Sequence, residues 1–174
     1  PVAVLVTCAG VMATSAAAAS IATMTADVWE RTFAVNALGT FLCVREFLRR
    51  YAEQAVPAGR IVTMSSAAAQ IGGYRGDAAY IASKAAVIGF TKIAARQAAA
   101  AGITVNCVAA GPVATPMFDR AMDEASLPGL LDRIPAGRIG QPAEIAALVA
   151  HLAGQDAGFI TGATFDVNGG YSMR

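Results

Sequence analysis

Four short runs of apolar and β-branched residues alternate along the chain with longer stretches of helical periodicity. The runs are Val2 to Thr7, Gly59 to Ser65, Ile103 to Ala109 and Thr164 to Val167. Continuous apolar runs of this length are typical of strands that are buried on both faces of a parallel sheet. The alternation therefore predicts βαβ units and an α/β fold.

The stretches between these runs are mostly helical in pattern. A helix is expected over Thr25 to Glu53, with Thr25 or Thr23 as its N-cap, because apolar residues recur there every three or four positions. Three further elements are expected: helices over Tyr80 to Ala101 and Ala143 to Ala153, and a final strand with a glycine turn over Ile160 to Tyr171.

The segment from Thr115 to Gly140 fits neither pattern. Several prolines interrupt it, and it is long enough to form short helices that cover a pocket. Within Met117 to Ile139, five apolar side chains suit an apolar ligand, but they would equally suit the core face of short helices: Phe118, Met122, Leu127, Leu130 and Leu131. Both interpretations stay open at this point.

Composition narrows the range of partners. Of 174 residues, 56% are hydrophobic and 14% are charged, which predicts one domain over residues 1–174 with a large core. The formal net charge is +1 and no basic run occurs, so nucleic acid is not an expected partner. Alanine accounts for much of the mean hydropathy of +0.52, and no apolar stretch is long enough for a membrane span or follows a signal-peptide pattern. A cytoplasmic location is therefore expected.

The cysteines and the single histidine carry no expected chemistry. Cys8, Cys43 and Cys107 are far apart in apolar segments, which predicts buried, reduced thiols. His151 lies in an apolar helical run and is expected to be a helix residue without a chemical role. No metal site is expected, because these residues do not form a set of zinc ligands.

The strongest chemical signal is the pentapeptide Tyr80-Ile81-Ala82-Ser83-Lys84 at the head of the second long helix. Positions i and i+4 share one helix face, so the phenol and the ammonium can point into one cleft. A free phenol has a pKa of about 10. A neighbouring ammonium favours the ionised form of the phenol, which eases proton exchange with an alcohol. Because Tyr-x-x-x-Lys occurs in many helices by chance, its meaning depends on context.

A strand that ends in hydroxyl groups precedes this motif. Ile61 to Ser66 ends in Ser65 and Ser66, and a loop rich in glycine and small residues follows over Ala67 to Gly76. Ligands of parallel α/β sheets bind beyond the carboxyl ends of the strands, which is where both serines are expected.

The order of these motifs resembles the short-chain dehydrogenase/reductase family from its fourth strand to its C-terminus, over essentially the whole chain. The catalytic tetrad of that family maps onto Asn36, Ser66, Tyr80 and Lys84. Ser65 remains a rival for the serine because the loop before Tyr80 is long. The resemblance implies a Rossmann-type, doubly wound parallel sheet, with NAD or NADP as cofactor.

The resemblance also implies a role for each member of the tetrad. Tyr80 would exchange a proton with the substrate oxygen, and Ser66 would hydrogen-bond the same oxygen. Lys84 would bind the nicotinamide ribose and bias Tyr80 electrostatically. Asn36 would fix a water molecule in the proton path.

Two other segments resemble parts of the family that contact the cofactor. In Ala110 to Thr115, alanine replaces the usual first proline, and four residues are cofactor-binding candidates: Gly111, Pro112, Val113 and Thr115. The segment Thr7-Cys8-Ala9-Gly10 stands where the family usually has Asn-Asn-Ala-Gly. Ala9 and Gly10 are further candidates, whereas Thr7 and Cys8 depart from the pattern.

The glycine-rich phosphate turn of the family does not occur in these 174 residues, and neither do counterparts of its first three strands. Strand 4 pairs with strand 1 in that fold, so Val2 to Thr7 would form an exposed apolar edge. We therefore expect a part of a longer enzyme. Alone, the 174 residues are expected to bind dinucleotide poorly and to have little activity.

The expected function is NAD(P)-dependent interconversion of a carbonyl and an alcohol on a small molecule: a ketone, a 3-oxoacyl thioester, a sugar or a steroid-like alcohol. The alternative is a catalytically inactive binding or scaffolding protein, which the absent turn favours and the complete tetrad disfavours. The resemblance implies a homotetramer or homodimer in which the two long helices pack against their copies.

Overall fold

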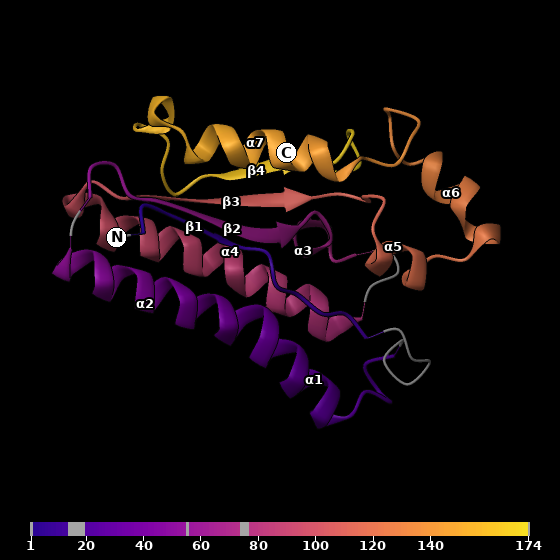
Figure 1. Cartoon of the computed structure of the whole chain (residues 1–174). Coiled ribbons are helices and arrows are strands. Elements are labelled where there is room, and N and C mark those ends of the chain that lie inside the picture. Colours follow the sequence, from indigo (N-terminus) through magenta and orange to yellow (C-terminus); the bar gives the residue numbers. More distant parts are fainter. Residues whose placement is uncertain (1, 14–19, 55, 74–76, 174) are drawn as a thin grey trace.

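In the computed structural model, the described residues are 2–13, 20–54, 56–73 and 77–173. Helix α7 (Pro142–Ala153) covers one face of a parallel sheet, and α2 (Gly39–Glu53) and α4 (Ala78–Ala98) cover the other (Figure 1). The sheet has the order β1-β2-β3-β4, with strands Val4–Thr7, Arg60–Ser66, Thr104–Ala110 and Thr164–Val167. The expected Rossmann-type, doubly wound α/β fold is confirmed.

The two central strands are buried because both of their faces are apolar. Ile61 of β2 lies opposite Val105 of β3, and both pack with α2 and α4. Val62 and Val108 point to the other face and pack with Leu152 of α7. All five side chains are at most 1% exposed, so β2 and β3 form a rigid base whose carboxyl ends can hold a site.

The first predicted helix consists of three consecutive pieces. They are α1 (Ala26–Phe33), a π-helical turn (Ala34–Leu38) and α2. Thr25 is the N-cap, since its hydroxyl accepts a hydrogen bond from the Val28 amide at 3.4 Å. The sequence pattern did not predict the π turn, a widened turn that often occurs at functional sites.

Helix α4 begins at Ala78, two residues before the predicted start, because the Asp77 side chain caps it. A 3₁₀ turn (Ala99–Ala101) continues it to Gly102, whose φ of +72° confirms the predicted terminal glycine. By length and apolar composition alone, Ala78–Ala101 would pass as a membrane span. In this fold it packs against β2 and β3 as a core helix.

Two segments differ in extent from the prediction. The last strand, β4, is shorter than Ile160 to Tyr171, because positive φ angles at Gly162 (+75°) and Gly169 (+63°) bend the chain on either side. The loop after Ser66 contains the short helix α3 (Ala68–Ile71), and its residues 74–76 lie outside the described part of the chain.

The expected short helices after Thr115 are present. They are α5 (Pro116–Ala121), a 3₁₀ turn (Glu124–Ser126) and α6 (Leu127–Leu131). Figure 1 shows α5 and α6 beyond the carboxyl ends of the central strands, on the side away from the N-terminus. They are therefore placed to cover a site at that end of the sheet.

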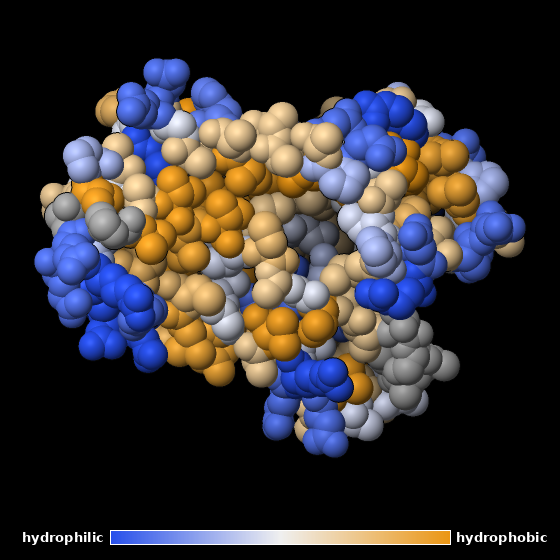
Figure 2. All heavy atoms as spheres, viewed as in Figure 1, coloured by the Kyte–Doolittle hydropathy of each residue, from blue (hydrophilic) through white to orange (hydrophobic). Residues whose placement is uncertain are grey.

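The prediction of three buried thiols was wrong for two of them. Cys107 is buried in β3, whereas Cys8, just beyond β1, and Cys43, on α2, are exposed. Among the described strands, β1 pairs only with β2, and Val2 and Val4 beside its open edge are 61% and 39% exposed. Figure 2 shows apolar side chains gathered where β1 runs in Figure 1, as expected for an uncovered edge.

Candidate active site

A cavity of about 570 Å³ lies beyond the carboxyl ends of β2 and β3. Ser66, at the end of β2, and Tyr80, in the first turn of α4, both line it. Asn36 and Lys84 are not among its lining residues and lie buried, 0% and 6% exposed. The structure thus brings two of the four tetrad candidates to one surface and places the other two in the core.

The surroundings of the Tyr80 phenol raise its pKa. Burial raises its pKa, the negative charge of Asp77 raises it further, and a hydrogen bond with the Ser66 side chain opposes the rise. We expected Lys84 to favour the phenolate, but its Nζ lies 6.0 Å from the centroid of the Tyr80 ring. A phenol with a raised pKa stays protonated at neutral pH.

Lys84 is a buried ammonium with a backbone partner. Its Nζ donates a hydrogen bond to the carbonyl oxygen of Met64 in β2 at 2.9 Å. Burial lowers its pKa, and the neighbouring thiols of Cys107 and Cys8 act in the opposite direction. A Cβ at Gly10 would lie 3.3 Å from Nζ, so this glycine keeps the space beside the ammonium open.

Asn36 fastens the chain that follows β1. Its Oδ1 accepts a hydrogen bond from the Val11 amide at 2.8 Å, and its Nδ2 donates to the Val11 carbonyl and the Ser83 Oγ, both at 2.9 Å. The Ser83 hydroxyl in turn donates to the Tyr80 carbonyl at 2.8 Å. Both amide hydrogens of Asn36 are used within the protein, so only Oδ1 has capacity left for a water.

The two candidate serines have different partners. The Ser65 hydroxyl is buried and donates to the carbonyl oxygen of Lys84 at 2.8 Å. The Ser66 hydroxyl accepts a hydrogen bond from the Ala68 amide at 3.2 Å and interacts with the Tyr80 phenol. This geometry favours Ser66 over Ser65 for contact with the same substrate atom as Tyr80.

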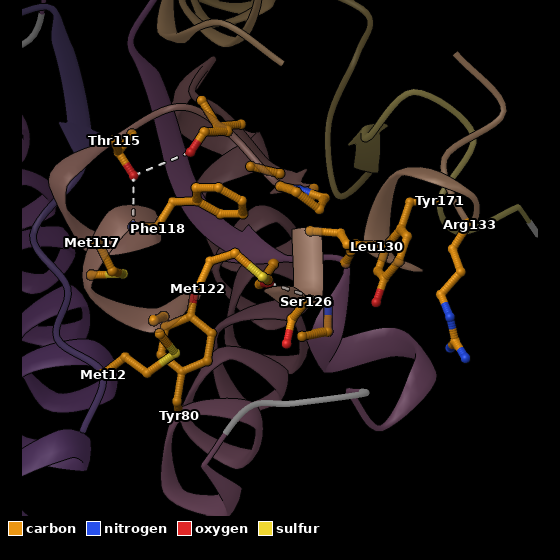
Figure 3. Close-up of a pocket in the computed structure, with 18 of the residues that line it drawn as sticks. Met12, Tyr80, Thr115, Met117, Phe118, Met122, Ser126, Leu130, Arg133 and Tyr171 are labelled. Atoms are coloured by element: carbon orange, nitrogen blue, oxygen red, sulfur yellow. Dashed lines mark hydrogen bonds between the residues drawn. The ribbon is translucent and has the colours of Figure 1, made fainter. Parts of the chain in front are cut away.

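The segment after β3 forms the opposite wall of the cavity. Gly111, Pro112, Val113 and Thr115 all line it. A Cβ at Gly111 would lie 2.6 Å from the Asn168 Cα, so glycine is needed for the exits of β3 and β4 to approach. The Thr115 hydroxyl caps α5, accepting from the Phe118 amide at 3.2 Å and donating to the Val113 carbonyl at 3.3 Å (Figure 3).

The remaining cofactor candidates, Ala9 and Gly10, lie outside this cavity. Ala9 is exposed beyond β1, and Gly10 lies beside Lys84 and Asn36. Gly10 is half-buried, and its lack of a side chain leaves space beside the Lys84 ammonium. The candidates therefore form two groups: Ala9 and Gly10 after β1, with Gly10 beside Lys84, and the four residues after β3 on the cavity wall.

The outer wall of the cavity is apolar and rich in methionine (Figure 3). Phe118, Met122 and Leu130 line it, which favours the ligand interpretation for these three residues. Leu127 and Leu131 are not among the lining residues, so the ligand interpretation has no support for these two. Among the described lining residues only Arg133 is charged, at the far end beside Tyr171.

Sequence reasoning missed three residues of this site. Asp77 could have been found, because an acidic residue just before a helical run is a frequent N-cap. Ser83 lies inside the recognised motif, but nothing in the sequence indicates its partner. Met12 lines the cavity, and no sequence signal marks it.

His151 is an exposed residue of α7, and the described ranges contain no group of three or more possible metal ligands.

Comparison with known proteins identifies the family. A family model for enoyl-(acyl carrier protein) reductase matches residues 1–172. The chain belongs to the short-chain dehydrogenase/reductase family. The resemblance seen in its motifs is thereby confirmed, including the likeness to 3-oxoacyl reductases.

Individual relatives support this assignment. The 3-oxoacyl-[acyl-carrier-protein] reductase FabG of Salmonella typhimurium is 41% identical over 147 residues, covering 84% of this chain and 59% of the relative. Human (3R)-3-hydroxyacyl-CoA dehydrogenase is 36% identical over 173 residues, covering 99% of this chain and 64% of the relative. The chain thus spans less than two thirds of the length of either relative.

Solved structures of the family superpose closely. A 3-oxoacyl-[acyl-carrier protein] reductase from Brucella melitensis gives a TM-score of 0.91 at 34% identity, over 98% of this chain and 63% of that one. A 4-hydroxyisoleucine dehydrogenase complexed with NADH gives 0.85 at 26% identity, over 98% of this chain and 69% of that one.

Proposed function

We propose that this chain carries the catalytic part of an NAD(P)-dependent oxidoreductase that interconverts a carbonyl and an alcohol. The observation that carries the proposal is the pair of hydroxyl groups, Tyr80 and Ser66, on one cavity wall with the Lys84 ammonium buried behind them. Membership of a family of oxidoreductases supports it. A catalytically inactive scaffold has no physical need for this arrangement.

Each residue has a defined task in this proposal. In the direction of reduction, Tyr80 gives its proton to the substrate oxygen, and Ser66 orients that oxygen by a hydrogen bond. Because the pKa of Tyr80 is raised, reduction should be constant through neutral pH and fall in the alkaline range, where the phenol loses its proton. Oxidation needs the phenolate and should rise over the same range.

The cofactor would be NAD or NADP, which supplies or accepts a hydride at its nicotinamide ring. Eight residues would hold it: Ala9, Gly10, Tyr80, Lys84, Gly111, Pro112, Val113 and Thr115. The small residues and the open space beside the Lys84 ammonium fit a sugar hydroxyl. The choice between the two nicotinamides depends on residues outside this set.

The substrate would be a carbonyl compound with an apolar body. The methionine-rich wall of Met12, Met117 and Met122 adapts to a flexible chain. Two of the relatives act, by their names, on 3-oxoacyl and 3-hydroxyacyl thioesters. A 3-oxoacyl thioester is therefore the substrate class that we would test first.

The test measures reduction of acetoacetyl-CoA by each reduced nicotinamide. Because the 174 residues contain no glycine-rich phosphate turn, they are assayed both alone and fused behind the amino-terminal part of Salmonella FabG that they do not match. We expect turnover by the fused protein and little by the chain alone. A folded fusion without turnover of either nicotinamide would contradict the proposal and favour the inactive scaffold.

We also propose that a second copy of the chain packs on an apolar groove between α1, α2 and α4. The groove holds about 610 Å³ and is lined by aromatic residues that include Phe33 and Phe90. Trp29, Leu38 and Phe41 on its border are 41%, 50% and 40% exposed, which is costly for a monomer surface. In analytical ultracentrifugation the unchanged protein should sediment as a dimer or tetramer, and the Phe41→Glu variant should sediment as a monomer. If the unchanged protein is itself a monomer, this proposal is contradicted.

A further inference from the structure

The chain that follows β1 is fastened at two neighbouring points. Asn36 binds both backbone groups of Val11, as described above. Two residues later, the Ala13 amide donates a hydrogen bond to Oδ2 of Asp77 at 2.8 Å. Met12 lies between the two fastened residues, and its side chain lines the cavity.

Asp77 joins parts of the chain that are 64 positions apart. Its second carboxylate oxygen, Oδ1, accepts a hydrogen bond from the Tyr80 amide at 2.6 Å and so caps α4. The side chain is buried, with 4% of its surface exposed. A buried carboxylate is costly unless both oxygens are satisfied, and here each oxygen holds a different segment.

The consequence concerns two side chains of the cavity. Tyr80 is held by Oδ1 and Met12 is flanked by the residue that Oδ2 holds. Figure 3 places Met12 and Tyr80 at the same end of the cavity. A change at Asp77 would therefore alter how the Met12 and Tyr80 side chains lie relative to each other, although, within the described part of the chain, the Asp77 carboxylate bonds only to the backbone amides of Ala13 and Tyr80.

We propose that Asp77 is a positioning residue that locks the Val11–Ala13 segment to the head of α4 and thereby fixes Met12 beside Tyr80 on the cavity wall. The inference rests on the proposed function in one respect, which is that this cavity receives the substrate. Met12 then limits the space next to the proton donor, and Asp77 sets where that limit lies.

The pKa of the Tyr80 phenol provides a second, independent readout of Asp77. The charge of Asp77 raises this pKa in addition to the effect of burial. Among the described residues, the other groups near this phenol are Lys84 on its own helix and Ser66 at the end of β2, while Arg133 lies at the far end of the cavity. None of these changes when Asp77 is neutralised, so the phenol should then titrate at a lower pH.

The experiment compares the unchanged 174-residue chain with Asp77→Asn and Asp77→Ser by NMR. Asparagine has one acceptor oxygen, and serine can cap a helix but is too short to bridge to Ala13. In both variants the Ala13 amide should exchange with solvent at least about tenfold faster, while the Tyr80 amide stays protected. The methyl signal of Met12 should shift, and the Tyr80 phenol, followed with ring-labelled tyrosine, should titrate at lower pH.

Asp27→Asn is the matched control, because Asp27 is an exposed acid in the first turn of α1. It should change none of these signals. Unchanged exchange at Ala13, or an unmoved Tyr80 titration, in both Asp77 variants overturns the proposal. Loss of the whole methyl spectrum in both variants also overturns it, because Asp77 would then support the entire fold. A failure of carbonyl reduction in the assay above leaves these readouts unaffected and concerns the proposed function alone.

Discussion

The two ends of helix α4 are both buried, but by different means. At the tail, Ala94, Ala95 and Ala98 are each 3% exposed and pack against apolar residues of α2 and β3. At the head, buried polar groups of Asp77, Ser83 and Lys84 each have a specific hydrogen-bonding partner. Burial of the apolar side chains at the tail stabilises the fold by itself. Burial of the polar groups at the head costs free energy unless each group keeps its hydrogen-bonding partner.

If the proposed function holds, the tail of α4 serves the stability of the fold and the head serves the reaction. A buried ammonium such as Lys84 costs desolvation energy that an apolar side chain of similar size would not. Under the proposed function, Lys84 beside Tyr80 serves the reaction and not the stability of the fold. Substitutions at the head should therefore lower activity more than stability, and substitutions at the tail should do the reverse.

The largest expected effect is that of Tyr80→Phe. Loss of the phenolic proton donor should lower kcat/KM for carbonyl reduction by about 10²- to 10⁴-fold in the fused protein. The melting temperature should change little, because the Tyr80 backbone bonds to Asp77 and Ser83 remain. Steady-state kinetics and thermal unfolding measure the two quantities. A large fall in melting temperature would contradict the claim that the head of α4 contributes more to activity than to stability.

Lys84→Met should come next. Removal of the ammonium beside the cofactor candidates should lower kcat/KM by about 10²-fold. Stability should stay nearly constant or rise, because the lost bond to the Met64 carbonyl is offset by the removed desolvation cost. Urea denaturation tests this directly. A strong destabilisation would show that Lys84 supports the fold after all.

At the tail, Ala98→Leu should destabilise the protein by about 1–3 kcal/mol, because the extra side chain has no room between α2 and β3. The matched control is Ala99→Leu, since Ala99 is exposed in the following 3₁₀ turn. Urea midpoints give the stabilities. The KM of folded Ala98→Leu should equal that of the unchanged protein, and a raised KM would contradict the separation of roles.

The smallest effect on stability should come from a polar pair at the middle of α4, between its apolar tail and its polar head. The pair joins Thr91 of α4 to Thr63 of β2. The Thr63 and Thr91 hydroxyl oxygens are 2.7 Å apart, and Thr91 also donates to the Val87 carbonyl at 2.8 Å. Thr63→Val should cost about 1 kcal/mol in unfolding free energy. Thr63→Ser keeps the hydroxyl but deletes a buried methyl group, so it measures the packing contribution separately in urea denaturation. An unchanged stability of Thr63→Val, which keeps the side-chain volume, would contradict a role for the hydroxyl pair.

Much of the fold could be predicted because its signals are local. Apolar runs gave all four strands, with the last one too long, and Thr25 and Gly102 were correctly placed as helix ends. The exposure of Cys8 and Cys43 could not be read from their apolar neighbours, because it depends on which face of an element is covered. Tertiary packing, not local pattern, decides such cases.

The site was predictable in its residue types but not in its connections. The resemblance implied that Tyr80 and Ser66 contact one substrate oxygen, and both line the cavity. Tyr80 and Lys84 were expected to point into one cleft, but Lys84 is not among the lining residues. Lys84 was expected to lower the pKa of Tyr80, whereas the net shift is upward because burial is its largest cause. The hydrogen bonds of Asn36 to Val11 and Ser83 and the bridge from Asp77 to Ala13 join distant segments, so no local sequence pattern predicts them.

The most direct test of the central claim follows the hydride itself. The fused protein is incubated with acetoacetyl-CoA and a reduced nicotinamide that carries deuterium at C4, and the product is examined by mass spectrometry. We predict one deuterium at the former carbonyl carbon with the unchanged site, and almost none with Tyr80→Phe over the same time. No incorporation by the unchanged site, or equal incorporation by both proteins, would contradict the account.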